Sequence, residues 1–290
     1  MTIAAASDTG ASSLAAPAAA VVTLGMYDPP FLHAAQDALW AALRRALVAE
    51  GVDTLAGRLP AALDRARPIG EALVDPRLAL GHTCGYPLRT RYAGRLKPVA
   101  TPVYATPYTE GGWHRSAIVV RVDEAAPDLA ALRGRVAAIN GTDSNSGMNL
   151  FRAALAPLAD GRPFFSAVVE TGAHLASVEA VAQGRADVAA IDGVTFTLAA
   201  RHAPERVAGV RVIAVTPASP GLPLVVPVDT PEPQVAAIRR ALDAFLADPA
   251  AADAREAFGL VGFEAIPEAA YDRVIELENA AIAAGYPRLA

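Results

Sequence analysis

The sequence predicts an α/β protein of two lobes with a cleft between them. Short apolar segments alternate with segments of helical spacing, which is typical of mostly parallel sheets flanked by helices. The region 117–216 holds a complete series of such units, and two β-rich passages, 116–122 and 210–228, flank it. Two passages between two units predict a hinge made of two crossover strands. Loops at the carboxyl ends of the strands are then expected to line the cleft.

The first predicted unit is a strand at 21–27 followed by a long helix. Asp28 is expected to cap this helix, with prolines in its first turn. Gly51 is expected to end it. Between these limits apolar residues recur at helical spacing: Leu32, Ala35, Leu39, Leu43 and Leu47.

Two more strands are predicted before the first crossover. Residues 78–87 have the composition of a buried strand that runs into a turn, and residues 97–104 form another apolar segment. Residues 106–112 are polar and rich in glycine, which indicates a loop.

The second lobe is predicted as a new series of alternating elements. Its strands are expected to be rich in β-branched residues and alanine, and its helices to end at glycines. The predicted strands are 116–122, 135–140, 164–170, 186–192 and 210–216, and the predicted helices are 128–133, 150–158 and 174–184.

The part of the chain after Pro231 has helical spacing and no further strand is predicted there. It is expected to return to the first lobe. The predicted organisation is therefore a leader at 1–20, a first lobe formed by 21–116 with 217–290, and a second lobe at 117–216.

Composition excludes several classes of protein. The formal net charge of −5 argues against nucleic acid as a partner. The single cysteine, Cys84, excludes an internal disulfide and a cysteine-based metal site. No segment reaches the roughly 18 uninterrupted apolar residues that a membrane helix needs.

The N-terminal segment 1–20 is rich in Ala and Ser but lacks Lys or Arg near its start. Its apolar run, 14–22, is short and contains Pro17, so it is a poor secretory signal. We interpret the segment as a flexible leader, with an unusual or cleaved export signal as the alternative.

The most informative segment is the polar turn 141–149. It lies between a predicted strand and a predicted helix and carries Ser144, Asn145 and Ser146 beside Gly147. A turn of this kind directs hydroxyls and backbone N–H groups toward one point, and a helix start adds partial positive charge. The segment predicts a site for a small oxyanion that needs no lysine or arginine, although an ordinary capped loop has the same composition.

Several segments, taken in order, resemble the phosphate, phosphite and phosphonate substrate-binding proteins of ABC transporters, which have the type II periplasmic-binding-protein fold. The resemblance covers roughly 21–227. The segments that carry it are Gly85-Tyr86-Pro87, residues 114–120, Ser144-Asn145-Ser146-Gly147, Thr171-Gly172-Ala173-His174, residues 181–192 and residues 216–223.

The resemblance implies roles for individual residues in an interlobe cleft. The Ser144-Asn145-Ser146 turn would hold ligand oxygens, and His174 would add a donor. Asp192 would accept a proton carried by the ligand, and Tyr27 would help to close the cleft. A helix cap for the carboxylate, a backbone-bonded histidine and core packing for the tyrosine remain the structural alternatives.

Three further residues complete the predicted ligand set. Gly147 would offer a backbone N–H group, Tyr86 ends a predicted strand near the cleft, and Ser116 lies where the chain first crosses between lobes. No metal is expected, because no second His or Cys lies at ligand spacing beside His174. His82 and Cys84 could form a nucleophile and base, but a structural cysteine is the favoured interpretation.

The resemblance therefore implies a solute-binding protein, not an enzyme, with no cofactor. Its partners would be a small anionic ligand and, in transport, a permease with its ATPase; monomers are usual in the family. The implied location is periplasmic, although the weak export signal leaves the cytoplasm open. Two alternatives share the fold: a cytoplasmic enzyme of menaquinone-type cofactor biosynthesis and a cytoplasmic ligand sensor.

Overall fold

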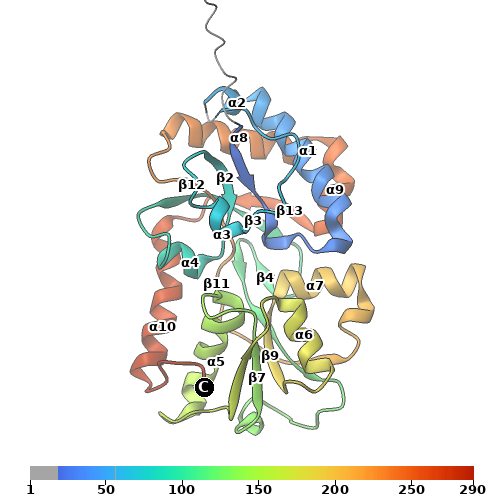
Figure 1. Ribbon diagram of the computed structural model, residues 1–290, viewed down its shortest axis with the longest axis vertical. Coiled ribbons are helices and arrows are strands. Elements are labelled where there is room, and N and C mark those ends of the chain that lie inside the picture. Colours follow the sequence, from blue (N-terminus) through green and yellow to red (C-terminus); the bar gives the residue numbers. More distant parts are fainter. Residues whose placement is uncertain (1–18, 56) are drawn as a thin grey trace, which may run out of the picture.

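Two five-stranded sheets, each with helices against it, form the two lobes of the chain (Figure 1). The computed structural model describes residues 19–55 and 57–290. The predicted leader 1–20 therefore lies outside the described residues, apart from Ala19 and Ala20.

The first lobe contains a sheet of strand order β1-β2-β12-β3-β13. Its strands are β1 (Val21–Thr23), β2 (Leu78–His82), β12 (Leu224–Pro227), β3 (Leu96–Tyr104) and β13 (Leu260–Glu264). Its helices are α1 (His33–Ala49), α2 (Val52–Leu55), α3 (Ile69–Ala72), α4 (Gly85–Arg89), α8 (Glu232–Ala247) and α9 (Ala252–Phe258).

The second lobe contains a sheet of strand order β10-β6-β9-β7-β8. Its strands are β10 (Val210–Val215), β6 (Ser116–Arg121), β9 (Val188–Asp192), β7 (Val136–Ile139) and β8 (Ala167–Glu170). Its helices are α5 (Leu150–Ala159), α6 (His174–Ala182) and α7 (Gly193–His202).

Both sheets are mixed, so the prediction of mostly parallel sheets is wrong. In the first sheet β1 and β2 are parallel, whereas β12 runs antiparallel to both of its neighbours and β13 antiparallel to β3. In the second sheet β7 is parallel to β8 and β9, whereas β6 is antiparallel to β9 and β10. The reason is the hinge: β6 and β12 enter their lobes from the cleft, while β2 and β9 end there.

The two crossovers meet in a small third sheet of order β11-β5-β4. Its strands are β4 (Thr109–Glu110), β5 (Trp113–His114) and β11 (Ser219–Pro220). The segment predicted as a loop at 106–112 thus contains a short strand. Pairing of β5 with β11 fastens the outgoing crossover to the returning one.

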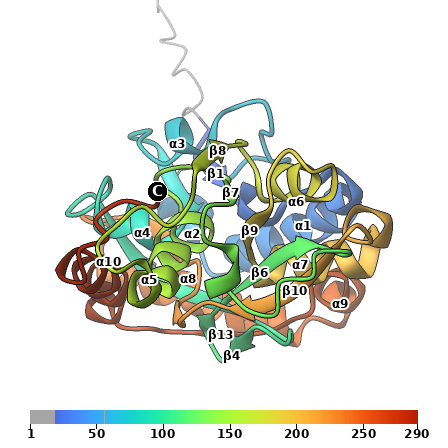
Figure 2. The same ribbon diagram turned by 90° about the horizontal axis from the view of Figure 1, so that it is seen from below.

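Alternation of side chains explains why the second sheet is covered on both faces. Ile118 and Val120 of β6 pack with Phe151 and Leu155 of α5. Their neighbours Ala117 and Val119 instead belong to the cluster that includes Val178 and Val181 of α6. Figure 2 shows α5 and α6 on opposite sides of this sheet.

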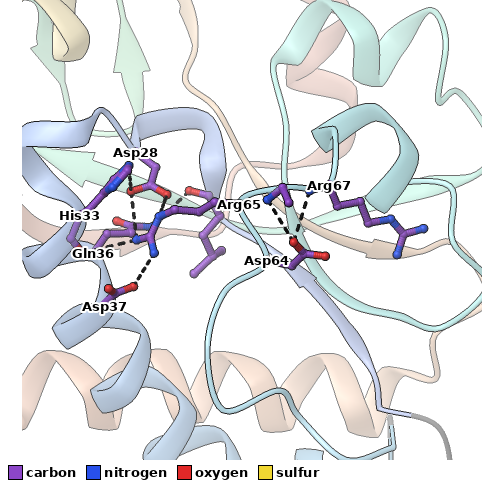
Figure 3. A network of polar contacts seen from close by, with 9 residues as sticks. Asp28, His33, Gln36, Asp37, Asp64, Arg65 and Arg67 are labelled. Atoms are coloured by element: carbon purple, nitrogen blue, oxygen red, sulfur yellow. Dashed lines mark hydrogen bonds and ion pairs between the residues drawn. The ribbon is translucent and has the colours of Figure 1, made fainter.

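Helix α1 begins later than predicted and Asp28 does not cap it. A 3-10 turn, Pro30–Leu32, precedes the helix, and its N-cap residue makes no side-chain cap. Asp28 instead accepts from Arg65, with Nε–Oδ2 at 2.6 Å, and Arg65 also pairs with Asp37 at 2.8 Å (Figure 3). This network fastens the loop around Arg65 to the start of the helix.

The C-terminal part of the chain departs from the prediction in two ways. It contains a strand, β13, which pairs with β3 at the edge of the first sheet. It ends in α10 (Arg273–Ala283), which packs against α4 of the first lobe and also against α5 of the second (Figure 1). Arg152 of α5 bonds Glu278 of α10 at 3.1 Å. The assignment of 217–290 to the first lobe stays a prediction.

None of the helices in the described part of the chain is long and apolar enough to cross a membrane.

Candidate functional site

A cavity of about 700 Å³ lies between the two lobes. From the first lobe it is lined by residues that follow β1 and β2, among them Tyr27 and Cys84. From the second lobe it is lined by residues that follow β7, β8 and β9, among them Ser146, His174 and Asp192. The carboxyl ends of five strands therefore meet at this cavity, as expected for an α/β protein.

The centre of the cavity is a hydrogen-bonded pair from two different segments. Ser146 belongs to the turn after β7, and His174 is the first residue of α6. Their side chains meet with Ser146 Oγ and His174 Nε2 at 2.9 Å. The backbone N–H of Asp192 lies 3.4 Å from Nδ1 of the same ring, a contact that favours the tautomer with its proton on Nε2.

The imidazole of His174 is neutral in this environment. Burial lowers its pKa, and the nearby carboxylate of Asp192 opposes that shift only in part. Neutral Nε2–H donates to Ser146, so the serine O–H is free to donate elsewhere. In this tautomer the hydroxyl hydrogen of Ser146 is available to a ligand in the cavity.

Asp192 connects the two lobes. It ends β9 and caps α7, because its Oδ1 accepts the Thr195 N–H at 2.9 Å. Its Oδ2 accepts the Tyr27 hydroxyl of the first lobe at 3.2 Å. Burial and the adjacent carboxylate raise the pKa of Tyr27, so the phenol stays protonated and donates. Asp192 therefore caps a helix, as the structural alternative predicted, and also lies at the cleft, as the resemblance implied.

The turn that carries Ser144 is a π-helical turn, Asn145–Asn149, followed directly by α5. Ser144 is its N-cap, and its Oγ accepts the Gly147 N–H at 3.0 Å. The Asn145 N–H points to Cys84 Sγ at 3.4 Å. The Gly147 N–H, which was expected to be offered to the ligand, is therefore already bonded within the turn, and Ser144 and Ser146 line the cavity with their hydroxyls.

Three of the predicted ligand residues lie behind the cavity wall. Asn145 donates to Ser219 Oγ of the returning crossover at 2.8 Å. Ser116 is fully buried and donates from Oγ to the Ser146 carbonyl at 2.9 Å. Gly147 has no room for a side chain, since a Cβ there would lie 1.9 Å from Asn140 Oδ1. These residues position the turn and do not line the cavity.

Tyr86 does not line the cavity either. It lies on α4, where its hydroxyl donates to Glu278 of α10 at 2.7 Å. The strand predicted at 78–87 ends at His82, and the chain then turns into a helix that carries Tyr86 away from the cleft.

The predicted alternative of a His82 and Cys84 pair is not formed. His82 Nε2 donates to the Leu222 carbonyl at 3.2 Å, away from the thiol. Burial raises the pKa of the Cys84 thiol and lowers the pKa of His82 to about 4. Both groups are therefore neutral near pH 7, which is the opposite of an activated thiolate.

The sequence prediction missed several polar residues of the cavity wall. Thr83 follows β2 and Thr195 lies in the first turn of α7. Asn140 precedes the predicted turn, Asp143 lies within it, and Arg91 lies between α4 and β3. Their positions just after strands were a usable signal for Thr83 and Asn140. Nothing in the local sequence marks Arg91, which lies in the turn after α4.

A second depression of about 680 Å³ lies between α7 and α9. Its main donors are already used, because Arg201 donates to the Glu256 carbonyl at 3.0 Å and His202 Nε2 to the Ala257 carbonyl at 2.7 Å. In the described part of the chain no group of His, Cys, Asp and Glu side chains could hold a metal ion. The interlobe cavity, and not this second depression, is therefore the candidate functional site.

Comparison with known proteins agrees with this geometry. Residues 69–271 match the family model described as the periplasmic substrate-binding protein of phosphonate ABC transporters. A binding protein component of an ABC phosphonate transporter from Pseudomonas aeruginosa has a similar structure, with a TM-score of 0.71 at 15% identity over 92% of this chain and 87% of that one. No curated protein sequence matches.

Two other similar structures were solved with ligands. A Prochlorococcus marinus protein in complex with methylphosphonate has a TM-score of 0.63 at 14% identity, over 90% of this chain and 97% of that one. A Xanthomonas citri protein bound to ATP has a TM-score of 0.66 at 19% identity, over 92% of this chain and 98% of that one. At these identities the structures establish a shared fold and no more.

Proposed function

Since the chain belongs to the family of periplasmic substrate-binding proteins of phosphonate ABC transporters, we propose that it captures a phosphorus oxyanion between its lobes. One observation carries this proposal. Ser146, His174, Asp192 and Tyr27 reach the same interlobe cavity from separate segments of both lobes. The bound ligand is then delivered to a permease driven by an ATPase.

The proposed site holds the anion with neutral donors. The Ser146 O–H donates to a ligand oxygen while its own oxygen accepts from His174. Ser144 and Thr195 add hydroxyls from the same lobe, and Thr83 adds one from the facing lobe. Such donors stabilise a buried anion through hydrogen bonds that are stronger than neutral pairs.

Asp192 gives this site its selectivity for protonated ligands. A carboxylate repels an oxyanion unless the ligand has a proton to donate to it. Hydrogen phosphate and hydrogen phosphonates carry such a proton near pH 7, whereas sulfate does not. Each oxygen of Asp192 has a second lone pair beyond the bond it already makes, so acceptance of a ligand proton leaves the Tyr27 bond intact.

The family and the fold support a transport role for this site. The methylphosphonate complex of the Prochlorococcus marinus protein shows that a protein of this fold takes a phosphorus ligand. A periplasmic location and a monomeric state belong to the same proposal, by analogy with the family.

Calorimetric titration with phosphate, phosphite, methylphosphonate and sulfate tests the proposal. We expect heat of binding from at least one phosphorus ligand and none from sulfate. Asp192→Asn keeps a residue that caps α7 well, but it removes the negative charge. This variant is expected to lose at least about tenfold in affinity for the protonated ligand, since hydrogen bonds to charged groups contribute about 1.5–3 kcal/mol.

Two outcomes contradict the proposal. Absence of binding by every phosphorus ligand at millimolar concentration removes the oxyanion function. Equal effects of Asp192→Asn on sulfate and on phosphorus ligands remove the role of the carboxylate as acceptor of the ligand proton.

A further inference from the structure

Resting on the proposed function, we infer that the ligand is a phosphonate or phosphate monoester with a bulky, mostly apolar and uncharged organic substituent. The phosphorus group lies at Ser146 and His174, and the substituent lies along the apolar wall that the first lobe presents to the cavity.

The cavity is much larger than a phosphorus oxyanion. Its volume of about 700 Å³ lies in the range of pockets that hold whole organic ligands, roughly 300–1,000 Å³. Inorganic phosphate has five heavy atoms and fills on the order of 100 Å³, about the share of three or four waters. Hydrogen bonding to the oxyanion alone therefore leaves most of the cavity to be filled.

The wall that the first lobe contributes to the cavity is rich in apolar side chains. The side chains of Met26, Ile69, Leu73, Pro87 and Leu222 all face the cavity from this lobe. Apolar surface of this kind gains from contact with carbon and offers no bond to a further polar group. A hydrated inorganic anion leaves this wall wet, whereas an organic substituent covers it.

Glycines hold this wall close to the sheet. A Cβ on Gly81 of β2 would lie 2.5 Å from Leu73 Cδ2, and a Cβ on Gly25 would lie 3.1 Å from Ile69 Cδ1. The absence of side chains at both positions lets Ile69 of α3 pack on the turn after β1, and Leu73, which follows α3, pack on β2. The apolar wall is thus a defined part of the fold and not a loose surface.

Apart from Asp192, the charged residues of the cavity wall are matched in sign: Arg91 and Arg206 stand against Asp143 and Glu179, and Asp28 is paired with Arg65. Arg91 lies over the ring of Tyr92 at 5.5 Å. Asp143 reaches the cavity from the opposite lobe, and the two side chains act on the pKa of Tyr92 in opposite directions. A wall whose remaining charges are balanced in this way favours neither an ammonium nor a carboxylate on the substituent.

Gly70 provides a variant that tests the placement. It lies on α3 and lines the cavity, and a Cβ there would meet Arg91 Nη1 and the Tyr92 hydroxyl oxygen at an ordinary 3.6 Å. Gly70→Leu adds side-chain volume to the cavity beside Arg91 and Tyr92, its Cβ meets no close contact, and it replaces a poor helix former. Glu71→Leu is the matched control, because Glu71 is exposed on the same helix and lies outside the cavity wall.

The experiment measures dissociation constants of phenylphosphonate, methylphosphonate and 2-aminoethylphosphonate for the three proteins. Phenylphosphonate has five more carbons than methylphosphonate and is expected to bind about tenfold tighter or more. Gly70→Leu should remove most of this gain and change methylphosphonate affinity less than about twofold. Glu71→Leu should leave both constants unchanged.

The outcomes separate the inference from the function on which it rests. If no phosphorus ligand binds, the proposed function fails. If methylphosphonate binds and phenylphosphonate binds no better, or if 2-aminoethylphosphonate binds tightest, the inference fails while the function stands. If Gly70→Leu weakens both ligands equally, the substituent does not lie along α3 and the inference also fails.

Discussion

Ser146 and His174 act together because the histidine ring donates to the serine oxygen and leaves the serine O–H for the ligand. The Asp192 N–H holds Nδ1 as an acceptor, so Nε2 donates to Ser146 and the serine hydroxyl donates onward. Ser116 fixes the same turn from behind through the Ser146 carbonyl. A hydroxyl oriented in advance does not have to lose rotational freedom when the anion arrives.

Ser146→Ala tests this orientation at the level of one oxygen atom. Loss of a hydrogen bond to a charged ligand is expected to weaken binding by about 10- to 100-fold. Isothermal titration with the tightest phosphorus ligand measures the change. Thr142→Ala is the control, since Thr142 is exposed in the same turn but lies outside the cavity wall. Equal affinities of Ser146→Ala and Thr142→Ala would show that the serine does not contact the ligand.

The sequence was sufficient to select residues that the fold brings to one cavity: Tyr27, Ser144, Ser146, His174 and Asp192. Each of these residues follows or ends a strand or starts a helix, and the ends of strands and helices can be predicted from the hydrophobic pattern of the sequence. The sequence was not sufficient to orient Asn145, because a π-helical turn rotates its side chain toward Ser219 of the crossover. Tyr86 was misplaced because the length of the strand before it was overestimated. Roles in ligand binding remain proposals for all of them.

At the scale of elements, helix α7 connects the site to both lobes. Asp192 caps it, and its residues Val194 and Leu198 are buried in the core cluster of the first lobe. Its first residue, Gly193, packs against the outgoing crossover. A Cβ there would lie 2.2 Å from Tyr108 Cβ and 2.6 Å from the Arg115 carbonyl oxygen.

Gly193→Ala is expected to destabilise the protein by about 1–3 kcal/mol. The new methyl group would press on the backbone carbonyl of Arg115, which belongs to the crossover and cannot shift as a side chain can. Urea denaturation measures the change in free energy of unfolding. Gly262→Ala is the control, since its Cβ would meet its nearest neighbour, Val103, at an ordinary 3.8 Å. A Gly193→Ala protein as stable as this control would contradict the close packing of α7.

The crossover β5 carries a buried histidine with no polar partner. Neither ring nitrogen of His114 has a hydrogen bond, and burial lowers its pKa from 6.5 to about 4. The unfolded chain therefore takes up a proton as the pH falls below about 6.5, while the folded chain resists it until about pH 4. The pH-dependent part of the free energy of unfolding that comes from His114 is therefore largest above pH 6.5 and decreases as the pH falls toward 4.

His114→Phe should flatten this part of the pH profile. A shift of this size corresponds to roughly 3 kcal/mol between the two limits, so the wild type should lose more stability than the variant between pH 6.5 and 4. Above pH 7 the variant should be more stable by about 1–3 kcal/mol, since two unpaired polar atoms are removed. Melting temperatures at several pH values measure both effects, and parallel profiles for the two proteins would contradict them.

The strands were largely predictable as elements, whereas their directions were not. A strand buried on both faces, such as β6 or β9, reads as the same apolar run in a parallel or an antiparallel sheet. The edge strand β13 was missed because it contains Gly262 and is only partly buried, so its sequence is not a continuous apolar run. The resemblance to one family is confirmed, and the mixed sheets follow from the crossovers of that fold.

At the scale of the whole molecule, two lobes meet through contacts on either side of the ligand cavity. Tyr27 and Asp192 join the lobes inside it. Helix α10 joins them on one flank through Arg152 and Glu278, and Arg201 and His202 reach α9 on the other. A ligand that contacts both lobes adds to these bonds and shifts the population toward the closed arrangement.

The structure of the chain with its tightest phosphorus ligand tests the central claim most directly. We expect ligand oxygens about 2.7–3.1 Å from the hydroxyls of Ser144 and Ser146, with Asp192 facing the protonated oxygen. A ligand held instead by Arg91 or Arg206, with no contact to Ser146, would contradict the account.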